Sequence, residues 1–452
     1  MVNTFLRWRK WFLLLIPVLS VLSYAQEQSR LTLQQAVQLA IEHNRTLGVS
    51  KTGIDRSRQQ YLAAATQRLP QLSFLANGGE LLTRPGLSFP AGSLGRLSDG
   101  ALVPSVDTTV QAARRPGAFV FGQINQPLTQ QHRIHLQLQS LLAAQEIAGE
   151  RRRQSEQDVI NQVRRTYYAI VAAESQLRSA EENIRLYREL DRLVEERVSQ
   201  QVSLKAESLD VKSRLAQAEY EATIPRDGAQ DSKEQLNILL GRPVETTFEV
   251  EPLQEVSREL PDLDTARQQA LINRPELRAA ALEVKRADLA RRAKVAEYIP
   301  DISLSLSYLS FVNTGSTLVG NIASAGLQVQ WEPFDWGRKR HEAAEIKEQE
   351  KAARLRQEDT AATIEMQLHG AWRKLREAQE LLNVSRLKQD SAHEAVRETQ
   401  IRFEQKAALL RDVLDTQTAK ANADDALCRA LAQFWSACAD FDRAAGSEKG
   451  AN

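Results

Sequence analysis

The chain repeats its own pattern, and this internal duplication limits its possible folds more than any other feature. When the sequence is shifted by 230 positions, residues 33–74 align with residues 263–304 without a gap, and nine residues are identical. A second register, shifted by 205, aligns residues 197–216 with residues 402–421. The matches keep the same order in both halves, which is typical of a duplicated structural unit.

Each half predicts the order helix, strand, loop, strand, long helix, turn and helix. In the first half the opening helical tract covers residues 32–69, with a weak point near Asn44, and in the second half it covers residues 264–299. Both tracts end at a proline, Pro70 or Pro300, which a helix interior does not accommodate well. An alternating tract begins after each proline.

The alternating tracts predict strands with one apolar and one polar face. The predicted strands are residues 71–82, 117–127, 301–312 and 323–333. In the third strand Ile302, Leu304 and Leu306 alternate with serines. About 10–12 residues suit a tilted strand of a membrane barrel, and a polar face without many charges suits a water-filled lumen. The alternative is a half-buried strand in a soluble sheet.

The helices form the larger part of the chain. Residues 128–198 contain no proline, and as one helix they would span roughly 105 Å. A helix this long and polar has to lie against other helices, in a coiled coil or a tube wall. The alternative is a soluble bundle or an extended coiled-coil adaptor. The Gly/Pro/Ser-rich loop 83–116 is much longer than the loop 313–322, and we expect either an exposed variable surface or partial disorder there.

The N-terminus predicts a signal peptide over residues 1–25. Arg7, Arg9 and Lys10 precede the apolar stretch 11–22, and a small-residue cleavage site ends at Ala25. The alternative is an uncleaved anchor. Loss of these three cations changes the formal charge from +1 to −2, so electrostatics gives no reason to expect nucleic-acid binding.

Catalytic chemistry is not indicated. The sequence holds no Walker P-loop, HExxH, G-x-S-x-G or CxxC motif, so we expect neither an enzyme nor a bound cofactor. His132 and His135 share a helix face, but no further ligand is near in sequence, so we expect no metal site. Cys428 and Cys438 would be roughly 15 Å apart on one helix, too far to form a disulfide.

Four motifs, in order, cover nearly the whole chain after the signal peptide. They are Leu31-Thr32-Leu33-Gln34-Gln35-Ala36, Leu239-Leu240-Gly241-Arg242-Pro243, Glu297-Tyr298-Ile299-Pro300-Asp301-Ile302 and Trp331-Glu332-Pro333-Phe334-Asp335-Trp336-Gly337-Arg338. Together with the duplication, this series resembles the TolC-like outer-membrane efflux proteins.

The resemblance implies a mainly α fold with a small β part. The duplicated helix–β-hairpin–long helix repeat would form a trimeric 12-strand barrel and a long α-helical periplasmic tunnel. The expected segments are the first repeat 26–243, a linker or equatorial segment 244–262, the second repeat 263–438 and a C-terminal equatorial tail 439–452. Four strands cannot enclose a lumen alone, whereas two chains give eight and three give twelve. The resemblance selects the trimer.

The resemblance also implies a function in the cell outer membrane, with extension into the periplasm. The chain would be the passive exit duct of a tripartite efflux system for small molecules. Its partners would be two further copies of itself, a periplasmic adaptor protein, an inner-membrane pump of RND or ABC type, and outer-membrane lipid. The alternatives are a type I protein-secretion duct and a periplasmic coiled-coil adaptor or structural protein, which would lack the two amphipathic hairpins.

Asp412 and Asp415 match the two aspartates of the family's periplasmic gate. At i and i+3 they share a helix face, and in a trimer they would form two rings of carboxylates that attract cations. The equivalents in the first half are Glu207 and Asp210. The resemblance selects the pair in the second half.

The resemblance places the adaptor-docking tips at Arg197 to Leu204 and at Arg402 to Leu409. Here the chain departs from the family pattern. Gln201 and Lys406 stand where a glycine is usual, and Ala408 stands where a basic gate residue can occur.

Overall fold

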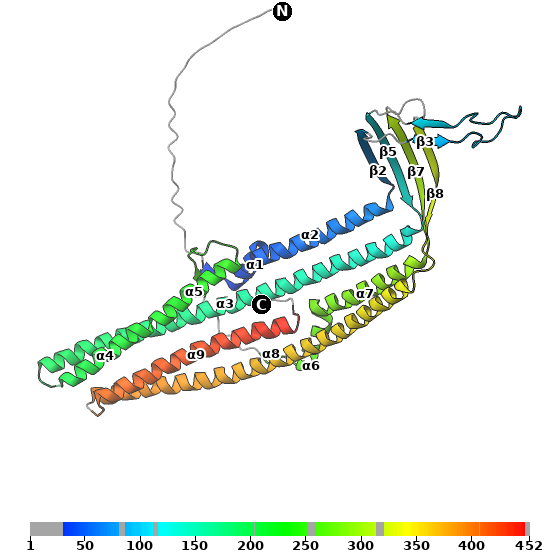
Figure 1. Cartoon of the computed structure of the whole chain (residues 1–452). Coiled ribbons are helices and arrows are strands. Elements are labelled where there is room, and N and C mark those ends of the chain that lie inside the picture. Colours follow the sequence, from blue (N-terminus) through cyan, green and yellow to red (C-terminus); the bar gives the residue numbers. More distant parts are fainter. Residues whose placement is uncertain are drawn as a thin grey trace, which may run out of the picture.

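The computed structural model describes residues 30–80, 86–111, 116–202, 204–251, 259–312, 321–405 and 407–447. The predicted signal peptide, residues 1–25, lies outside the described residues. The molecule is elongated, with a four-stranded sheet at one end and long helices that run away from it (Figure 1).

The first half follows the predicted order of elements. It comprises β1 (Arg30–Leu31), α1 (Leu33–His43), α2 (Arg45–Ala65), η1 (Thr66–Arg68), β2 (Gln71–Glu80), β3 (Gly86–Phe89), β4 (Thr108–Gln111), β5 (Pro116–Pro127), α3 (Gln130–Ser199), α4 (Lys205–Glu221), α5 (Thr223–Leu239) and β6 (Glu249–Val250). The long helix predicted from the proline-free tract is α3, whose 70 residues correspond to roughly 105 Å.

The second half repeats this order with fewer breaks. It comprises α6 (Leu263–Asn273), α7 (Pro275–Val295), η2 (Ala296–Tyr298), β7 (Asp301–Val312), β8 (Asn321–Gln330), α8 (Arg338–Glu404) and α9 (Leu410–Ala444). The helix α9 runs unbroken across residue 438, where the sequence placed a segment boundary. Its counterpart in the first half is divided into α4 and α5, with Pro225 near the start of α5, where a missing N–H costs little.

The opening helical tract is interrupted at the same place in both halves. The predicted weak point at Asn44 is real, because the Asn44 side chain accepts hydrogen bonds from the N–H groups of Thr46 and Leu47 and caps α2. The prediction of one unbroken helix over 264–299 is wrong. That tract breaks at Arg274, which lies 230 positions after Asn44, because Pro275 restricts the preceding residue to extended backbone.

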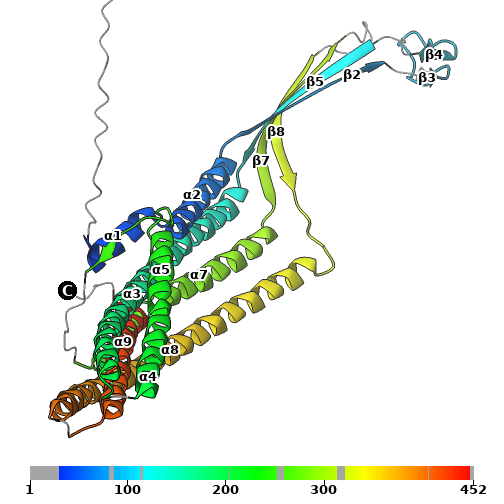
Figure 2. The same cartoon turned by 90° about the vertical axis from the view of Figure 1, so that its left-hand side faces the viewer.

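The four strands form one antiparallel sheet in the order β2-β5-β7-β8, so the hairpins of the two halves pair through β5 and β7 (Figure 2). Pairing places Leu72, Ile124, Leu306 and Ala325 in one row on one face of the sheet. The adjacent row on the other face holds Ser73, Gln123, Ser307 and Ser324. The predicted division into an apolar and a polar face is therefore present.

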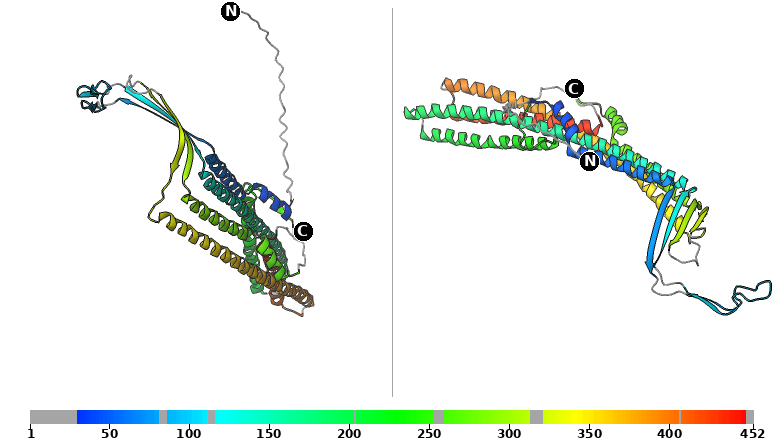
Figure 3. Two further views of the ribbon diagram at one scale, coloured as in Figure 1. Left: turned by 90° about the vertical axis from the view of Figure 1, so that its right-hand side faces the viewer. Right: turned by 90° about the horizontal axis from the view of Figure 1, so that it is seen from above.

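One strand prediction is wrong, and one loop holds strands that the sequence did not predict. The last strand is Asn321–Gln330, not 323–333, because Pro333 has no N–H to donate and the Asp335 side chain starts a helix cap soon after. The long loop 83–116 contains ordered structure, because β3 and β4 pair as a hairpin beyond the far end of the sheet (Figure 3). Residues 313–320 of the other loop lie outside the described part.

The long helices are accompanied by shorter ones along their length. Towards the sheet α2 lies along α3 and α7 along α8, and towards the tips α4 and α5 lie along α3 and α9 along α8. The helix α3 also packs against α7 and α9, which joins the two halves. Among the described residues, no helix has both the length and the apolar character needed to cross a membrane.

The core lies mainly around the middle of the helices. One cluster joins α1 to α3 and the end of α5, around the buried Val163, Tyr167 and Leu236. A second joins α6, α8 and α9, around Leu368 and Phe434. The short strands β1 and β6 pair in parallel beside the first cluster, so part of the segment predicted as equatorial packs against this middle region.

Candidate functional sites at the two ends of the helices

The two tips have the same backbone turn. In the first tip the N–H of Val202 donates to the carbonyl of Arg197 (2.9 Å), and in the second tip the N–H of Ala407 donates to the carbonyl of Arg402 (2.7 Å). This bond closes a Schellman turn at a helix C-terminus, which needs a residue in left-handed conformation. Gln201 occupies that position with φ 61°. The departure from glycine therefore leaves the turn intact, and Lys406, the equivalent residue, lies outside the described residues.

The tips expose apolar side chains next to charged ones. Leu204 and Leu409, at the equivalent starts of α4 and α9, are 69% and 70% exposed. The Arg197 guanidinium lies over the Phe403 ring, 5.0 Å from its centroid, and links the two tips. Arg402 forms an ion pair with Glu398. The structure thus brings the four predicted tip residues to one end of the molecule, on two neighbouring turns.

The two predicted gate aspartates differ in what they contact. The Asp412 carboxylate accepts a hydrogen bond from the N–H of Leu409 (3.0 Å) and so caps the start of α9. Asp415 lies one turn further along, exposed over half of its side chain, and accepts a hydrogen bond from Arg214 (3.1 Å). Asp412 therefore shapes the turn, whereas Asp415 connects the two halves.

Arg214 is the residue that the sequence did not single out. Its guanidinium contacts Asp415 from the second half and Asp210 from its own helix (3.5 Å), which are equivalent positions of the two repeats. It also donates to the Thr418 hydroxyl, which is paired with Tyr187. Burial lowers the pKa of Arg214, but the hydrogen bond that Arg214 donates to Asp415 and the charges of both aspartates outweigh it, so the pKa is raised. The spacing of Asp210 and Arg214, four residues apart, was the available signal.

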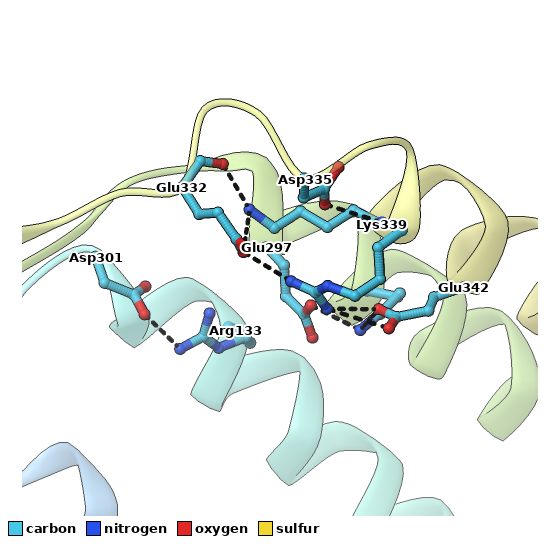
Figure 4. Close-up of polar contacts among 9 residues, drawn as sticks. Arg133, Glu297, Asp301, Glu332, Asp335, Lys339 and Glu342 are labelled. Atoms are coloured by element: carbon cyan, nitrogen blue, oxygen red, sulfur yellow. Dashed lines mark hydrogen bonds and ion pairs between the residues drawn. The ribbon is translucent and has the colours of Figure 1, made fainter.

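At the other end, an ion-pair cluster joins the strands to the helices (Figure 4). Arg133 of α3 binds Asp301 at the start of β7 (3.1 Å). Lys294 of α7 binds both Glu297 (2.7 Å) and Glu342 of α8 (2.6 Å), and these bonds raise its pKa. The cluster fixes the position of both long helices relative to the sheet.

The turn between β8 and α8 is held by its own polar groups. The Asp335 carboxylate accepts from the N–H groups of Lys339 (3.0 Å) and Gly337 (3.1 Å), and these bonds lower its pKa. Lys339 in turn donates to the carbonyl of Glu332 (3.0 Å). Gly337 adopts φ 86°, which a glycine accommodates without strain.

The same turn exposes three aromatic rings. Trp331, Phe334 and Trp336 are 60%, 69% and 88% exposed, and the last two rings stack edge to face with centroids 4.9 Å apart. Aromatic side chains of this kind are typical of the level at which a membrane barrel meets the headgroups.

The remaining polar candidates have ordinary contacts. The ring nitrogens of His135 lie 2.9 Å from Arg68 and 3.0 Å from Gln139. Cys428 and Cys438 are not joined by a disulfide in the described structure, and burial raises the pKa of the Cys428 thiol. Within the described ranges, no group of three or more potential metal ligands occurs.

The described architecture matches known proteins. Solved structures with the same fold include the outer-membrane channel OprN (20% identity, TM-score 0.74, 92% of this chain and 89% of that chain). The CmeC outer membrane channel of Campylobacter jejuni gives 15% identity and a TM-score of 0.75 (92% and 85%). The MtrE outer membrane channel of Neisseria gonorrhoeae gives 18% and 0.71 (92% and 88%).

The family comparison covers both halves of the chain. No curated protein sequence matches it. The outer membrane efflux protein family, by contrast, matches residues 36–242 and 266–447, which is most of the chain and follows its duplication. The mainly helical fold and the small amphipathic sheet are consistent with this family match. The chain therefore belongs to the outer membrane efflux protein family, whose members are channels of the outer membrane.

Proposed function

We propose that the protein is the outer-membrane exit duct of a tripartite efflux system and acts as a homotrimer. The observation that carries this proposal is one chain that joins an amphipathic sheet to helices of 70 and 67 residues. Such helices span roughly 100 Å, enough for a tunnel that continues the barrel into the periplasm. The sheet contributes four strands and has two open edges, so three copies supply twelve strands.

The helical tips are the proposed docking surface for a periplasmic adaptor, which in turn binds an inner-membrane pump of RND or ABC type. The exposed Leu204 and Leu409, flanked by Arg197 and Arg402, support this assignment. Transport through this subunit is passive, and the pump supplies the energy. The two amphipathic hairpins favour a channel over a periplasmic adaptor.

A deletion strain tests the efflux role. Loss of the gene is expected to increase the accumulation of pump substrates, and the restored gene is expected to reverse it. A variant with Leu204→Glu and Leu409→Glu is expected to reach the outer membrane as a heat-modifiable trimer but not to restore efflux. If the deletion instead abolishes export of a protein and leaves accumulation unchanged, the duct serves type I protein secretion.

Asp412 and Asp415 are the proposed gate at the inner end. Two rings of three carboxylates would favour cations at the tunnel entrance. The hydrogen bond of Asp415 to Arg214 supports a gate that is held through the ion pair between the two halves. Planar-bilayer recordings of the Asp412→Ala, Asp415→Ala double variant test this: cation selectivity and block by multivalent cations are expected to fall, and unchanged values would reject the gate.

A further inference from the structure

In the proposed barrel the polar face of the sheet is the inner face, because the apolar face is the one that contacts lipid. Along β7 the exposure alternates, since Ser303 is buried whereas Leu304, Leu306 and Tyr308 are about half exposed. The serine side of β7 is thus the less exposed side, and in the proposed barrel the apolar side faces lipid. Ser307 and Ser324 are hydrogen-bonded across this inner face (2.7 Å).

The inner face does not stay polar along its whole length. Two residues further from the helices than Ser73, Gln123, Ser307 and Ser324, the pairing aligns Leu75, Phe121, Leu309 and Ile322. The register places all four on the inner face, in one row across all four strands. The following row adds Phe119 and Phe311. These six residues form what we call the apolar band.

The inner face offers little charge to a solute. Among the described residues of the four strands, Asp301 is the one charged residue on this face, and it is bound to Arg133. The strand positions near the helices carry serine, asparagine and glutamine side chains instead. Recognition on this face therefore depends on apolar contact and neutral hydrogen bonds.

In the proposed trimer the apolar bands of the three chains lie too far apart to block the lumen. Twelve strands spaced about 4.8 Å apart and tilted about 40° give a backbone circle about 24 Å across. Side chains from opposite walls of such a circle do not meet, so the band lines an open passage. An apolar ring beside water gains free energy when it contacts apolar surface of a solute.

We propose that the apolar band is a contact site for amphipathic organic small molecules as they leave the channel, and that such molecules are a cargo class of this duct. The proposal rests on the proposed trimeric channel. The aromatic or alkyl part of the solute contacts Phe121 and Leu309, while its polar part stays in the water of the lumen. Small ions pass the band without binding.

Ion current through the reconstituted full-length trimer tests the proposal, with two cations of equal charge as probes. All arms carry Arg214→Ala, so that the ion pair at the tips does not limit the current. Tetraphenylphosphonium added on the extracellular side is expected to reduce the current at concentrations at least about tenfold lower than tetramethylammonium does. The Phe121→Ser, Leu309→Ser double variant is expected to lose most of this difference.

A matched control also replaces two large side chains by serine, but on the outward face of the same two strands. Val120 and Tyr308 precede the two band residues and point outward, so Val120→Ser with Tyr308→Ser is expected to retain the difference between the probes. Equal potency of the probes on the parent channel, or an unchanged difference in the band variant, would overturn the proposal. Absence of current in every arm would instead reject the proposed channel, and the band's role with it.

Discussion

Arg214 gives the inner end of the molecule a contact that the repeat does not duplicate. It holds Asp210 and Asp415, which occupy equivalent positions of the two halves, whereas its own equivalent in the second half is Ala419. The guanidinium is 28% exposed, so it is only partly screened by water. The link between α4 and α9 near the tips therefore depends on a cation from the first half, and the second half provides no equivalent one.

Removal of this link is expected to open the inner end. An ion pair of this exposure contributes about 0.5–1 kcal/mol, and 1 kcal/mol changes an equilibrium about fivefold for each chain. Arg214→Ala is therefore expected to raise single-channel conductance or open probability and to strengthen cation selectivity, because Asp210 loses its partner and Asp415 keeps only the ion pair with Arg411 (3.7 Å). Arg214→Lys keeps the charge and is expected to lie between the two. Wild-type conductance in Arg214→Ala would show that the pair does not hold the gate.

The Tyr167 hydroxyl stabilises the middle region of the molecule, and this stabilisation is lost at high pH. Its buried hydroxyl donates to the carbonyl of Leu31 (2.9 Å) and accepts from the N–H of Glu251 (3.0 Å). Burial raises the pKa of Tyr167 to about 12 against the opposing bond with Glu251. The folded protein thus holds the proton more tightly than the unfolded chain, so this contribution is complete below pH 10 and is lost as the pH rises to about 12.

Tyr167→Phe tests that contribution. The variant is expected to unfold more easily by about 1–3 kcal/mol at neutral pH, because the carbonyl of Leu31 and the N–H of Glu251 each lose their hydrogen bond with the hydroxyl and keep only the longer one between them (3.3 Å). The difference from the wild type should shrink by up to about 2.7 kcal/mol between pH 10 and 12. Thermal denaturation in detergent measures both values. A difference that stays constant with pH would contradict the assignment.

At the scale of elements, the sequence predicted the helices and strands well where the pattern was regular. The proline-free tract became α3, and alternation placed β7 at its observed bounds. The break at Arg274 was missed because the apolar pattern continues through it, although Pro275 was a local signal. The end of β8 was missed because Trp331 continues the alternation while the next residues form a cap.

The two equivalent helix breaks are expected to differ in stability. Arg274 is 2% exposed, and its guanidinium binds Glu276 (2.8 Å), Gln367 (2.9 Å) and the carbonyl of Arg443 (3.1 Å). Burial lowers its pKa. Arg274→Ala removes one partner of a buried pair and is expected to cost about 3–5 kcal/mol.

The matched variant at the first break is Asn44→Ala, which loses a cap and a hydrogen bond to the carbonyl of Leu239. Its expected cost is about 1–2 kcal/mol. Thermal unfolding of both variants in the same detergent gives the comparison. Equal losses would contradict the expected difference, and no loss in Arg274→Ala would show that the second break depends on Pro275 alone.

Parts of the candidate sites were beyond a single sequence. Motif spacing located Asp412 and Asp415, and periodicity gave the two faces of the strands. The partner of Asp415 comes from a residue 201 positions away, which no local pattern reveals. The apolar band likewise depends on pairing: Phe121 and Leu309 become neighbours only when the register between β5 and β7 is known.

At the scale of the whole molecule, the sheet has two edges of equal length. β2 and β8 each have ten residues and pair on one side only within a single chain. Open edges of this length bind further strands unless they are blocked. Pairing of β2 in one copy with β8 in the next closes the sheet without leaving an edge.

This arrangement predicts a trimer that depends on the β8 edge. Outer-membrane fractions are expected to contain a heat-modifiable species at three times the mass of one chain. Ala325→Pro, within β8, is expected to reduce this species strongly, because proline removes a backbone donor and distorts the edge. Thr109→Pro, in the separate hairpin, is the control that should leave the trimer intact. Equal effects of both variants would argue against closure through β8.

The parallel pairing of β1 with β6 also implies an order of events in time. These strands bring the start and the end of the first repeat together, and the cluster beside them receives only Ala439, with Trp435 packed against it, from α9. Since a protein is synthesised and delivered from its N-terminus, we expect the first repeat to bury most of this core before the second repeat has folded. The helices α7 and α9 pack against α3, so we expect the first copy of the duplicated unit to serve as the template on which the second assembles.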